Sequence, residues 1–422
     1  MHGDPFPTRP NCQDGDPAML PFEAARQRML DPLTPVPGTV TWPVRDTLGM
    51  VLAEEIRAPV DVPSHTNAAV DGYAVRGDDL REGETVVLRL CGDAFAGHPF
   101  TGGVAPGQCV RIMTGAPMPA GTDTAIMQEH TVIDSDRVSI APGRRPGENV
   151  RKAGEDIQRG AVALTSGTVL HPAHIGLLAS LGRAEVRIRR PLRVAFFSTG
   201  DELRSVGEPL GPGEIYDSNR YTLHGMLRRL NVDIVDLGVV CDQPQALRAA
   251  FARAAESADV LLTSGGVSVG EADYVRGILE ELGQVEFWKI AMKPGRPFAC
   301  GRIGDCRFFG LPGNPVAVMV TFYELVQPAL RRLQGITETD AGRRLQLPCR
   351  SRLRKKPGRT EFLRGIIEPG ADGGFEVRTT GPQGSGILRS MSEANCFIIL
   401  PHDSGDLEPG ALVEVQPFDG LV

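Results

Sequence analysis

The chain has 422 residues, a formal net charge of −7 and 41% hydrophobic residues. A chain of this length exceeds one ordinary hydrophobic core, so we expect two to four domains. The acidic balance argues against a nucleic-acid-binding protein, which carries a basic domain or stripe, and no stretch approaches the roughly 20 apolar residues that cross a bilayer.

Cysteine usage and the N-terminal segment bear on the cellular compartment. The eight cysteines are scattered without a CxxC pair, which is typical of reduced thiols in the cytoplasm. The closest pair, Cys300 and Cys306, is better explained as the two arms of a hairpin than as metal ligands. Residues 1–18 are polar and rich in proline, so we predict a disordered leader and not a secretory signal.

The first third of the chain predicts an elongated domain that a second domain interrupts. Residues 21–30 and 44–54 are expected to be helices, and a strand and a helix are expected before residue 182. Short apolar runs broken by Gly and Pro between Tyr73 and Ile140 predict a small β barrel or sandwich. We therefore assign 19–60 and 148–188 to the elongated domain and 61–147 to an inserted β domain.

The central segment, 189–335, predicts a doubly wound α/β domain. Three apolar strands are expected at 192–198, 232–240 and 260–264, and a further strand near 285–290. Helical stripes of apolar residues separate them, for example Leu247, Ala250, Phe251 and Ala254. Successive βα units imply right-handed crossovers and a parallel sheet with helices on both faces.

The end of the chain predicts a hairpin, a helix and another β domain. Residues 298–311 are expected to form the hairpin, and Pro315 suits the first position of a helix that runs to about Leu333. Short apolar runs then recur from 342 to 422, which we assign to a C-terminal β module.

Gly-rich loops follow the predicted strands. The run SGGVS contains Ser264, Gly265, Gly266 and Ser268, and it comes directly after a buried strand. Glycines let backbone N–H groups approach an anion and serines add hydroxyl donors, so the run suits a phosphate. A plain tight turn is the alternative.

Acidic residues also gather at predicted strand ends. They are Asp201, Glu202, Asp217, Asp242 and Asp273. Carboxylates brought together need a cation or hydrogen-bond donors, which suggests a Mg²⁺ site beside a phosphate. For Asp217 and Asp242, helix capping is an equally good explanation.

Basic residues mark the strand and loop around KPGRP. Lys289, Lys293 and Arg296 fall within eight positions, and Lys289 stands beside Trp288 in an apolar strand, where it needs an anionic partner. A solvated surface face is the alternative. In the C-terminal module, Arg364 and Ser385 become candidate substrate contacts if that module packs against a cleft.

Eight stretches together resemble the MoeA family, the molybdopterin molybdenumtransferases, which is similar to the E domain of gephyrin. They are AVDGYA (69–74), RIMTGAP (111–117), GEDI (154–157), STGDEL (198–203), YDSN (216–219), SGGVSVGEADY (264–274), KPGRPF (293–298) and LPGNPV (311–316). The resemblance covers nearly everything from Pro21 to the C-terminus.

The resemblance implies a reaction and a set of site residues. A homodimer of four-domain subunits would insert molybdate into adenylylated molybdopterin and release AMP, with Mg²⁺ required. Molybdate would contact Lys289, Lys293, Arg364 and Ser385 through charge-assisted hydrogen bonds. The positions that the family ties to activity are Asp71, Thr114, Asp156, Glu202, Asp242, Asp273, Pro312 and Pro315.

Within that set, Asp242, Asp273 and Glu202 are the predicted Mg²⁺ ligands. Asp71, Thr114 and Asp156 lie outside the sheet domain, so the resemblance implies that a second subunit brings them to the cleft. Partners in the cofactor pathway, such as the adenylyltransferase that makes the substrate, are compatible with this picture. Neither nucleic acid nor a membrane is expected to bind.

Two other functions remain as alternatives. A molybdopterin adenylyltransferase would share the sheet domain, but it normally lacks the flanking β modules. A non-catalytic scaffold of the gephyrin type would share the whole fold. A scaffold has no reason to bury the unpaired charges of the acidic and basic loops.

Overall fold

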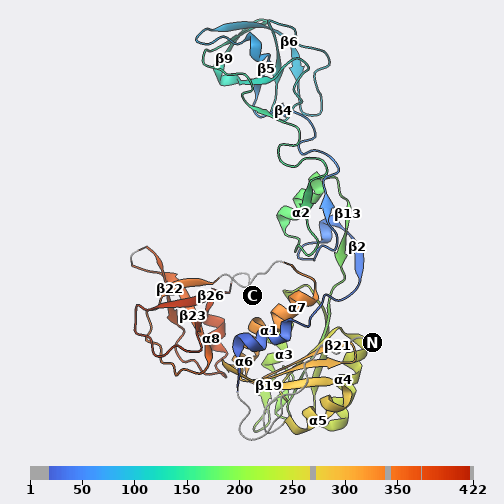
Figure 1. Ribbon diagram of the computed structural model, residues 1–422, viewed down its shortest axis with the longest axis vertical. Helices are drawn as coiled ribbons and strands as arrows, with labels where there is room; N and C mark the ends of the chain where they lie inside the picture. Colours follow the sequence, from blue (N-terminus) through green and yellow to red (C-terminus); the bar gives the residue numbers. More distant parts are fainter. Residues whose placement is uncertain (1–18, 267–271, 338–343, 372, 419–422) are drawn as a thin grey trace.

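A computed structural model describes residues 19–266, 272–337, 344–371 and 373–418, with only the backbone of 272–274. An arm leads from two packed lobes to a small sheet at its far end (Figure 1). The predicted leader, 1–18, and the predicted start of the last module at 342 lie outside the described residues.

The arm is built by two antiparallel stretches of chain, one running outward and one returning. They pair as β2 (Thr39–Pro43) with β13 (Glu185–Arg189), β3 (Ile56–Arg57) with β12 (Val162–Leu164), and β4 (Asn67–Ala68) with β11 (Val150–Arg151). The helix α2 (Pro172–Ser180) packs on the first two pairs, where Leu52, Ile188 and Leu178 are fully buried.

The predicted helix at 44–54 is wrong. Only a single 3-10 turn, η1 (Val44–Asp46), forms there, and Gly49 follows with a φ of +74°. Val51 and Leu52 then pair as isolated bridges with Val169 and Ile188. The apolar residues Val51 and Leu52 instead belong to an extended segment of the arm.

The inserted segment forms a six-stranded sheet in the order β8-β5-β7-β6-β10-β9. Its strands are β5 (Gly72–Val75), β6 (Val86–Ala94), β7 (Gln108–Ile112), β8 (Thr124–Met127), β9 (Thr131–Asp134) and β10 (Arg137–Ile140), with 3-10 turns η2 (Gly77–Asp79) and η3 (Gln128–His130). Tyr73 and Val75 are buried on one face and Ala74 on the other, as the period of a strand requires. The all-β prediction for this segment is confirmed.

A mixed sheet in the order β17-β14-β18-β21-β20-β19 forms the α/β lobe. Its strands are β14 (Arg193–Thr199), β17 (Asp233–Val240), β18 (Val260–Ser264), β19 (Gln284–Lys293), β20 (Pro297–Ile303) and β21 (Cys306–Leu311). All run parallel except β20, which is antiparallel to both of its neighbours. The parallel order predicted for the βα units is confirmed for β14, β17, β18 and β21, and the antiparallel β20 is one arm of the predicted hairpin.

Helices cover both faces of this sheet, as predicted. Along β14, Val194 and Phe196 belong to one core and Ala195 and Phe197 to the other. The first core takes α1 (Phe22–Leu30) and α3 (Ser218–Arg228), and the second takes α4 (Pro244–Ser257) and α5 (Ala272–Leu282). Two short strands, β15 (Leu203–Arg204) and β16 (Ile215–Tyr216), pair beside the sheet.

The helix predicted from Pro315 to Leu333 contains a wide turn. It comprises α6 (Pro315–Thr321), a π-helical segment η4 (Phe322–Val326) and α7 (Gln327–Leu333). Pro328 lacks an N–H and its ring would clash with the carbonyl of Glu324 in a regular α-helix. The π turn accommodates that proline without ending the helix.

The C-terminal module continues the central sheet. It comprises β22 (Leu345–Pro348), β23 (Thr360–Pro369), β24 (Phe375–Thr379), β25 (Cys396–Leu400), β26 (Leu412–Pro417) and α8 (Arg389–Glu393). The strand β23 pairs in parallel with β19, and β1 (Leu20–Pro21) pairs with the same strand. Phe362 and Phe397 belong to the core that also holds Phe22, whose ring centroid lies 5.1 Å from that of Phe362.

The base of the arm is fixed to the α/β lobe by Arg190. Its guanidinium donates two hydrogen bonds of 2.7 Å to Asp259, the residue before β18, and a third to the carbonyl of Pro37. Burial alone would raise the pKa of Asp259, but the bonds from Arg190 and from the Arg193 amide hold it below the ordinary value. Among the described residues, no helix is both long and apolar enough to cross a membrane.

Candidate active site

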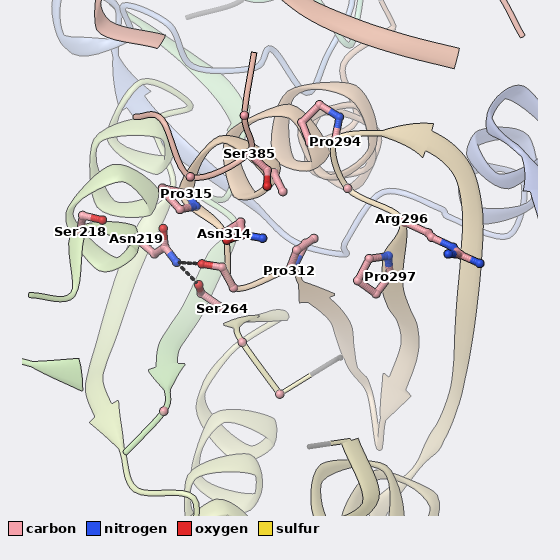
Figure 2. A pocket seen from close by; sticks show the side chains of 18 of the residues that line it. Ser218, Asn219, Ser264, Pro294, Arg296, Pro297, Pro312, Asn314, Pro315 and Ser385 are labelled. Carbon is pink, nitrogen blue, oxygen red and sulfur yellow. Dashed lines mark hydrogen bonds between the residues drawn. The ribbon is translucent and has the colours of Figure 1, made fainter. Parts of the chain in front are cut away.

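A cleft of about 740 Å³ lies where the carboxyl ends of β14, β18, β19 and β21 meet the C-terminal module. Loops after each strand form one wall, and residues of the C-terminal module form the other (Figure 2). The lining residues are Thr199, Gly200, Glu202, Leu203, Ile215–Asn219, Ser264–Gly266, Met292–Pro297, Pro312–Pro315, Ala317, Arg359 and Gln383–Gly386. Parallel strands place a ligand site at this edge of a sheet.

The cleft gathers about half of the predicted site residues. Those that line it are Glu202, Ser264, Gly265, Gly266, Lys293, Pro312, Pro315 and Ser385. Asp242, Lys289 and Arg364 lie outside the lining, and Asp71, Thr114 and Asp156 lie on the arm. Ser268 and the side chain of Asp273 lie outside the described residues.

The Gly-rich loop after β18 lies against the end of β14. Gly265 and Gly266 have φ values of +93° and +70°, and a Cβ on Gly265 would lie 2.6 Å from the Thr199 carbonyl oxygen. The amide of Gly265 donates to the carbonyl of Leu311, so this N–H is not available to a ligand. Glycine is therefore needed here first for close packing of the loops.

Asn219, which the sequence prediction missed, braces the floor of the cleft. Its side-chain amide donates to Ser264 Oγ at 2.8 Å and to the Gly313 carbonyl at 2.7 Å, as Figure 2 shows. Asn219 is 9% exposed, and its Oδ1 has no hydrogen-bond partner among the described residues. The YDSN motif was the available signal, because it places Asn219 in the first turn of the helix after a loop.

Asp217 and Asp242, for which capping and metal binding were equally good explanations, differ in the structure. Asp217 is the N-cap of α3, since its carboxylate accepts a 3.0 Å hydrogen bond from the Arg220 amide. Asp242 caps no helix: the N-cap of α4 is Gln243, and Asp242 instead accepts the hydroxyl of Thr199. Helix capping is thus the outcome for Asp217 alone.

Acidic groups therefore occupy the β14 side of the cleft. Glu202 lines it, and its carboxylate lies against Gly200. The Asp242 amide lies 3.4 Å from Asp201 Oδ1. No group of three His, Cys, Asp or Glu side chains around one point occurs within the described residues, which omit the side chain of Asp273.

Basic groups occupy the opposite side. Lys293 ends β19, and its ammonium lies 3.1 Å from a carboxylate oxygen of Glu361, which is 3% exposed. Arg296 and Arg359 also line the cleft. Lys289 stands earlier in β19, half-buried beside Trp288 as expected from the sequence.

Arg364 lies directly behind the loop that carries Ser385. It is fully buried, donates from Nε to Ser390 Oγ at 3.0 Å, and donates from Nη2 to the Gly384 carbonyl at 3.1 Å. Burial lowers the pKa of Arg364 to about 10. The Gln383 side chain accepts a hydrogen bond from the amide of Arg364 and donates one to its carbonyl. Through these contacts Arg364 holds the C-terminal wall of the cleft in place.

Two of the three predicted residues on the arm are paired with each other. The amide and hydroxyl of Thr114 donate to Asp71 Oδ1 at 2.8 and 2.7 Å. These two hydrogen bonds lower the pKa of Asp71. Asp156 is exposed at the base of the inserted sheet, and its amide donates to the Val62 carbonyl.

Taken together, the cleft has carboxylates on one side, cations on the other and glycines at its floor. Such a site suits a ligand that carries phosphate and, through it, a divalent cation. The arm residues lie far from this cleft within the same chain (Figure 1).

Family models match the chain in three consecutive regions. The MoeA N-terminal region (domain I and II) matches residues 20–182, a probable molybdopterin binding domain matches 195–332, and the MoeA C-terminal region (domain IV) matches 346–418.

Individual proteins are similar over nearly the whole chain. Molybdopterin molybdenumtransferase of Haemophilus influenzae is 43% identical over 96% of this chain and 100% of its own length. Gephyrin of Dictyostelium discoideum is 33% identical over 88% of this chain and 58% of its own length. The crystal structure of the molybdopterin biosynthesis moeA protein from Pyrococcus horikoshii OT3 has a TM-score of 0.83 at 28% identity, and covers 94% of this chain and 100% of that chain.

Proposed function

Because the chain belongs to the MoeA family of molybdopterin molybdenumtransferases, we propose that the cleft inserts molybdate into adenylylated molybdopterin and releases AMP. The chain is a transferase of molybdenum cofactor biosynthesis. The observation that carries the finer proposal is the cleft with two charged sides at the carboxyl ends of the strands.

The chain's own residues act by binding and orienting the two substrates. The floor takes the pterin phosphate at Gly266 and at the Ser264 hydroxyl, which Asn219 positions, and the cations beside β19 attract molybdate. The two dithiolene thiols bond to molybdenum, and the molybdate oxygen that they replace leaves with the thiol protons as water. A water molecule adds to phosphorus as the phosphoanhydride bond breaks, which releases AMP and leaves the phosphate on the pterin. Because the cleft holds both substrates, the reaction takes place within one complex and not on a chance encounter in solution. This accelerates the reaction without a covalent intermediate between substrate and protein.

A Mg²⁺ ion fits the acidic side of the cleft. Mg²⁺ usually takes one or two carboxylates together with substrate phosphate oxygens, so a dedicated protein cage is not required. Asp242, which lies beside Asp201, and Glu202 would hold it, and Asp273 remains a predicted third ligand. When bound, the ion neutralises charge on the phosphate oxygens.

The site is completed by a second copy of the chain in this proposal. Asp71, Thr114 and Asp156 lie on the arm, away from the cleft of their own chain (Figure 1). An arm that reaches the cleft of a second copy accounts for their proposed role, so we expect a homodimer. We also propose that the protein works in the cytoplasm, since the seven described cysteines are free thiols and five of them are buried.

Release of AMP tests the proposal directly. Purified protein is mixed with adenylylated molybdopterin, molybdate and Mg²⁺, and AMP is measured by chromatography. We expect AMP only when all three are present. Release no faster than in a protein-free control would refute the proposal.

The same assay separates the two alternatives. An adenylyltransferase would consume ATP and unmodified molybdopterin, and a scaffold would turn over neither substrate pair. ATP is therefore included as a separate arm, and consumption of ATP without AMP release from the adenylylated substrate would favour the adenylyltransferase.

A further inference from the structure

We propose that Arg359 is the cation of the C-terminal wall that contacts the tetrahedral oxyanion in the cleft. This inference rests on the proposed function for the identity of the substrate. It extends that proposal to a residue that no sequence motif discussed above contains.

The conspicuous cations around the cleft are already engaged. Lys293 is paired with the buried carboxylate of Glu361 at 3.1 Å. Arg364 is fully buried and donates to Ser390 and to the Gly384 carbonyl behind the lining. Arg359, by contrast, lines the cleft and forms no hydrogen bond or ion pair with any residue that the structure describes.

The backbone around Arg359 is held on both sides. On the C-terminal side, Thr360 begins β23 and pairs with Met292 of β19. On the N-terminal side, the Gly358 amide donates to the His402 carbonyl at 2.9 Å. The position of Arg359 is therefore fixed by the same sheet that positions Lys293.

A buried lysine builds the turn that precedes Arg359. Lys355 is 4% exposed, and its ammonium donates to the carbonyls of His402 and Ser404 at 3.2 and 3.0 Å. Its own amide donates to Asp406 at 2.7 Å. Lys355 thus uses its charge inside the module and leaves Arg359 as the group that faces the cleft.

The nearby carboxylates Glu361 and Asp403 act on cations other than Arg359. Burial lowers the pKa of Lys355, the negative charges of Glu361 and Asp403 raise it, and the positive charges of Arg359 and Lys293 lower it. Asp403 is 95% exposed, so water screens its share of this compensation. A planar guanidinium with several N–H donors matches a tetrahedral oxyanion, such as molybdate or the phosphate of AMP.

Equilibrium binding tests the proposal without turnover. Wild-type, Arg359→Ala and Arg354→Ala proteins are titrated calorimetrically with molybdate alone and, separately, with AMP alone. Arg354 is a matched control because it is an exposed arginine of the same module that lies outside the cleft lining. We expect Arg359→Ala to weaken one of the two ligands about tenfold or more, and Arg354→Ala to change both by less than about twofold.

The pattern of losses identifies the oxyanion. A loss confined to molybdate assigns Arg359 to molybdate, and a loss confined to AMP assigns it to the phosphate. Arg359→Lys, which keeps the charge, should restore part of the affinity. If Arg359→Ala does not fold, Arg359→Gln gives the same test with a longer side chain.

Three results would overturn the proposal: unchanged binding in Arg359→Ala or Arg359→Gln, an equal loss in Arg354→Ala, or a wild-type protein that binds neither anion. Failure of the proposed function gives a different result. In that case wild-type protein would bind an oxyanion through Arg359 but release no AMP from the adenylylated substrate.

Discussion

Asn219 connects three separate segments of the cleft: the start of α3, the end of β18 and the loop before α6. One side-chain amide donates to both Ser264 Oγ and the Gly313 carbonyl. This side chain therefore joins α3 to the cleft floor, in addition to the backbone pairing that already joins β18 to β21.

Asn219→Ala should lower the free energy of unfolding by about 1 to 3 kcal/mol, because the buried Ser264 hydroxyl and the Gly313 carbonyl both lose a hydrogen bond. It should also weaken binding of the adenylylated substrate. Asn314→Ala is the matched control, since Asn314 is an exposed cleft residue with no side-chain capping bond, and it should change stability by less than about 0.5 kcal/mol. Denaturant unfolding measures the stability of both variants, and an equal loss of stability in the two would contradict the bracing role of Asn219.

Asp71 and Thr114 give a second prediction for single residues. Thr114→Val keeps the amide bond to Asp71 but removes the hydroxyl bond, so the pKa of Asp71 should rise towards its ordinary value. Thr114→Ser should leave that pKa low. Carbon NMR titration of the Asp71 carboxyl measures it.

In the AMP assay, Thr114→Val should reduce the rate about tenfold, the worth of one hydrogen bond to a charged group. Thr114→Ser should retain most of the rate. If the valine variant keeps both the low pKa and the full rate, the hydroxyl has no role in the reaction.

At the scale of elements, the π segment η4 carries an unusual acid. Glu324 is 3% exposed, and its Oε1 has no hydrogen-bond partner among the described residues. Burial raises the pKa of Glu324 to about 7, although Arg344 and Arg26 act in the opposite direction and Glu23 and Glu414 in the same one. The neutral form of this side chain is therefore the one that the fold prefers.

Glu324 should make stability depend on pH. Its carboxyl is neutral in both states below about pH 4.5, and stability is lost as pH rises from there through the folded-state pKa of about 7. Glu324→Gln should be more stable than wild type at pH 8 by about 2 to 3 kcal/mol, and similar to it at pH 4.5. Denaturant unfolding at several pH values measures the difference. Glu23→Gln, at a nearby exposed acid, should show no such trend, and a parallel trend in both variants would refute the assignment.

The sequence predicts elements best where one period of apolar residues continues through the whole element. Residues 260–264 match β18, and the stripe of Leu247, Ala250, Phe251 and Ala254 is the buried face of α4. The helix prediction for residues 44–54 fails because Gly49 has a positive φ, which interrupts a helix, and because Leu52 pairs with Ile188 of β13. The antiparallel direction of β20, by contrast, follows from the predicted hairpin, because only a short turn separates β20 from β21.

At the scale of the whole molecule, the arm separates two sets of proposed site residues. Asp71 directly precedes β5 of the inserted sheet, and Glu202 lines the cleft of the α/β lobe. Figure 1 shows that sheet and that lobe at opposite ends of the molecule. A site shared between two copies predicts complementation between damaged chains.

Asp71→Asn and Glu202→Gln chains should each be nearly inactive alone. After they are mixed, unfolded and refolded together, mixed dimers should contain one site with neither substitution, and AMP release should return. The control is a mixture of each variant with itself. No recovery in mixtures that size-exclusion chromatography shows to be dimeric would contradict the shared site.

The location of the candidate site could be predicted from the sequence, but which of its cations supports the wall and which faces the ligand could not. Strand-end loops identify the cleft, since parallel strands end at one edge. Whether a cation there is free depends on partners that are distant in sequence: Glu361 compensates Lys293, and Arg364 is buried behind the lining. Motif position alone could not distinguish Arg364, which supports the wall, from Arg359, which faces the cleft.

The hydrogen-bonded pairing of β19 with β23 has a consequence for the entropy of binding. The two walls of the cleft belong to one sheet and share one hydrophobic core, so they are already ordered before a ligand arrives. The conformational entropy of ordering the two walls is lost when the chain folds, so it is not lost again when the ligand binds. A cleft with walls fixed in this way cannot close like a hinge around its substrate. Exclusion of water must come from something laid over its mouth, and an arm from a second copy of the chain would serve.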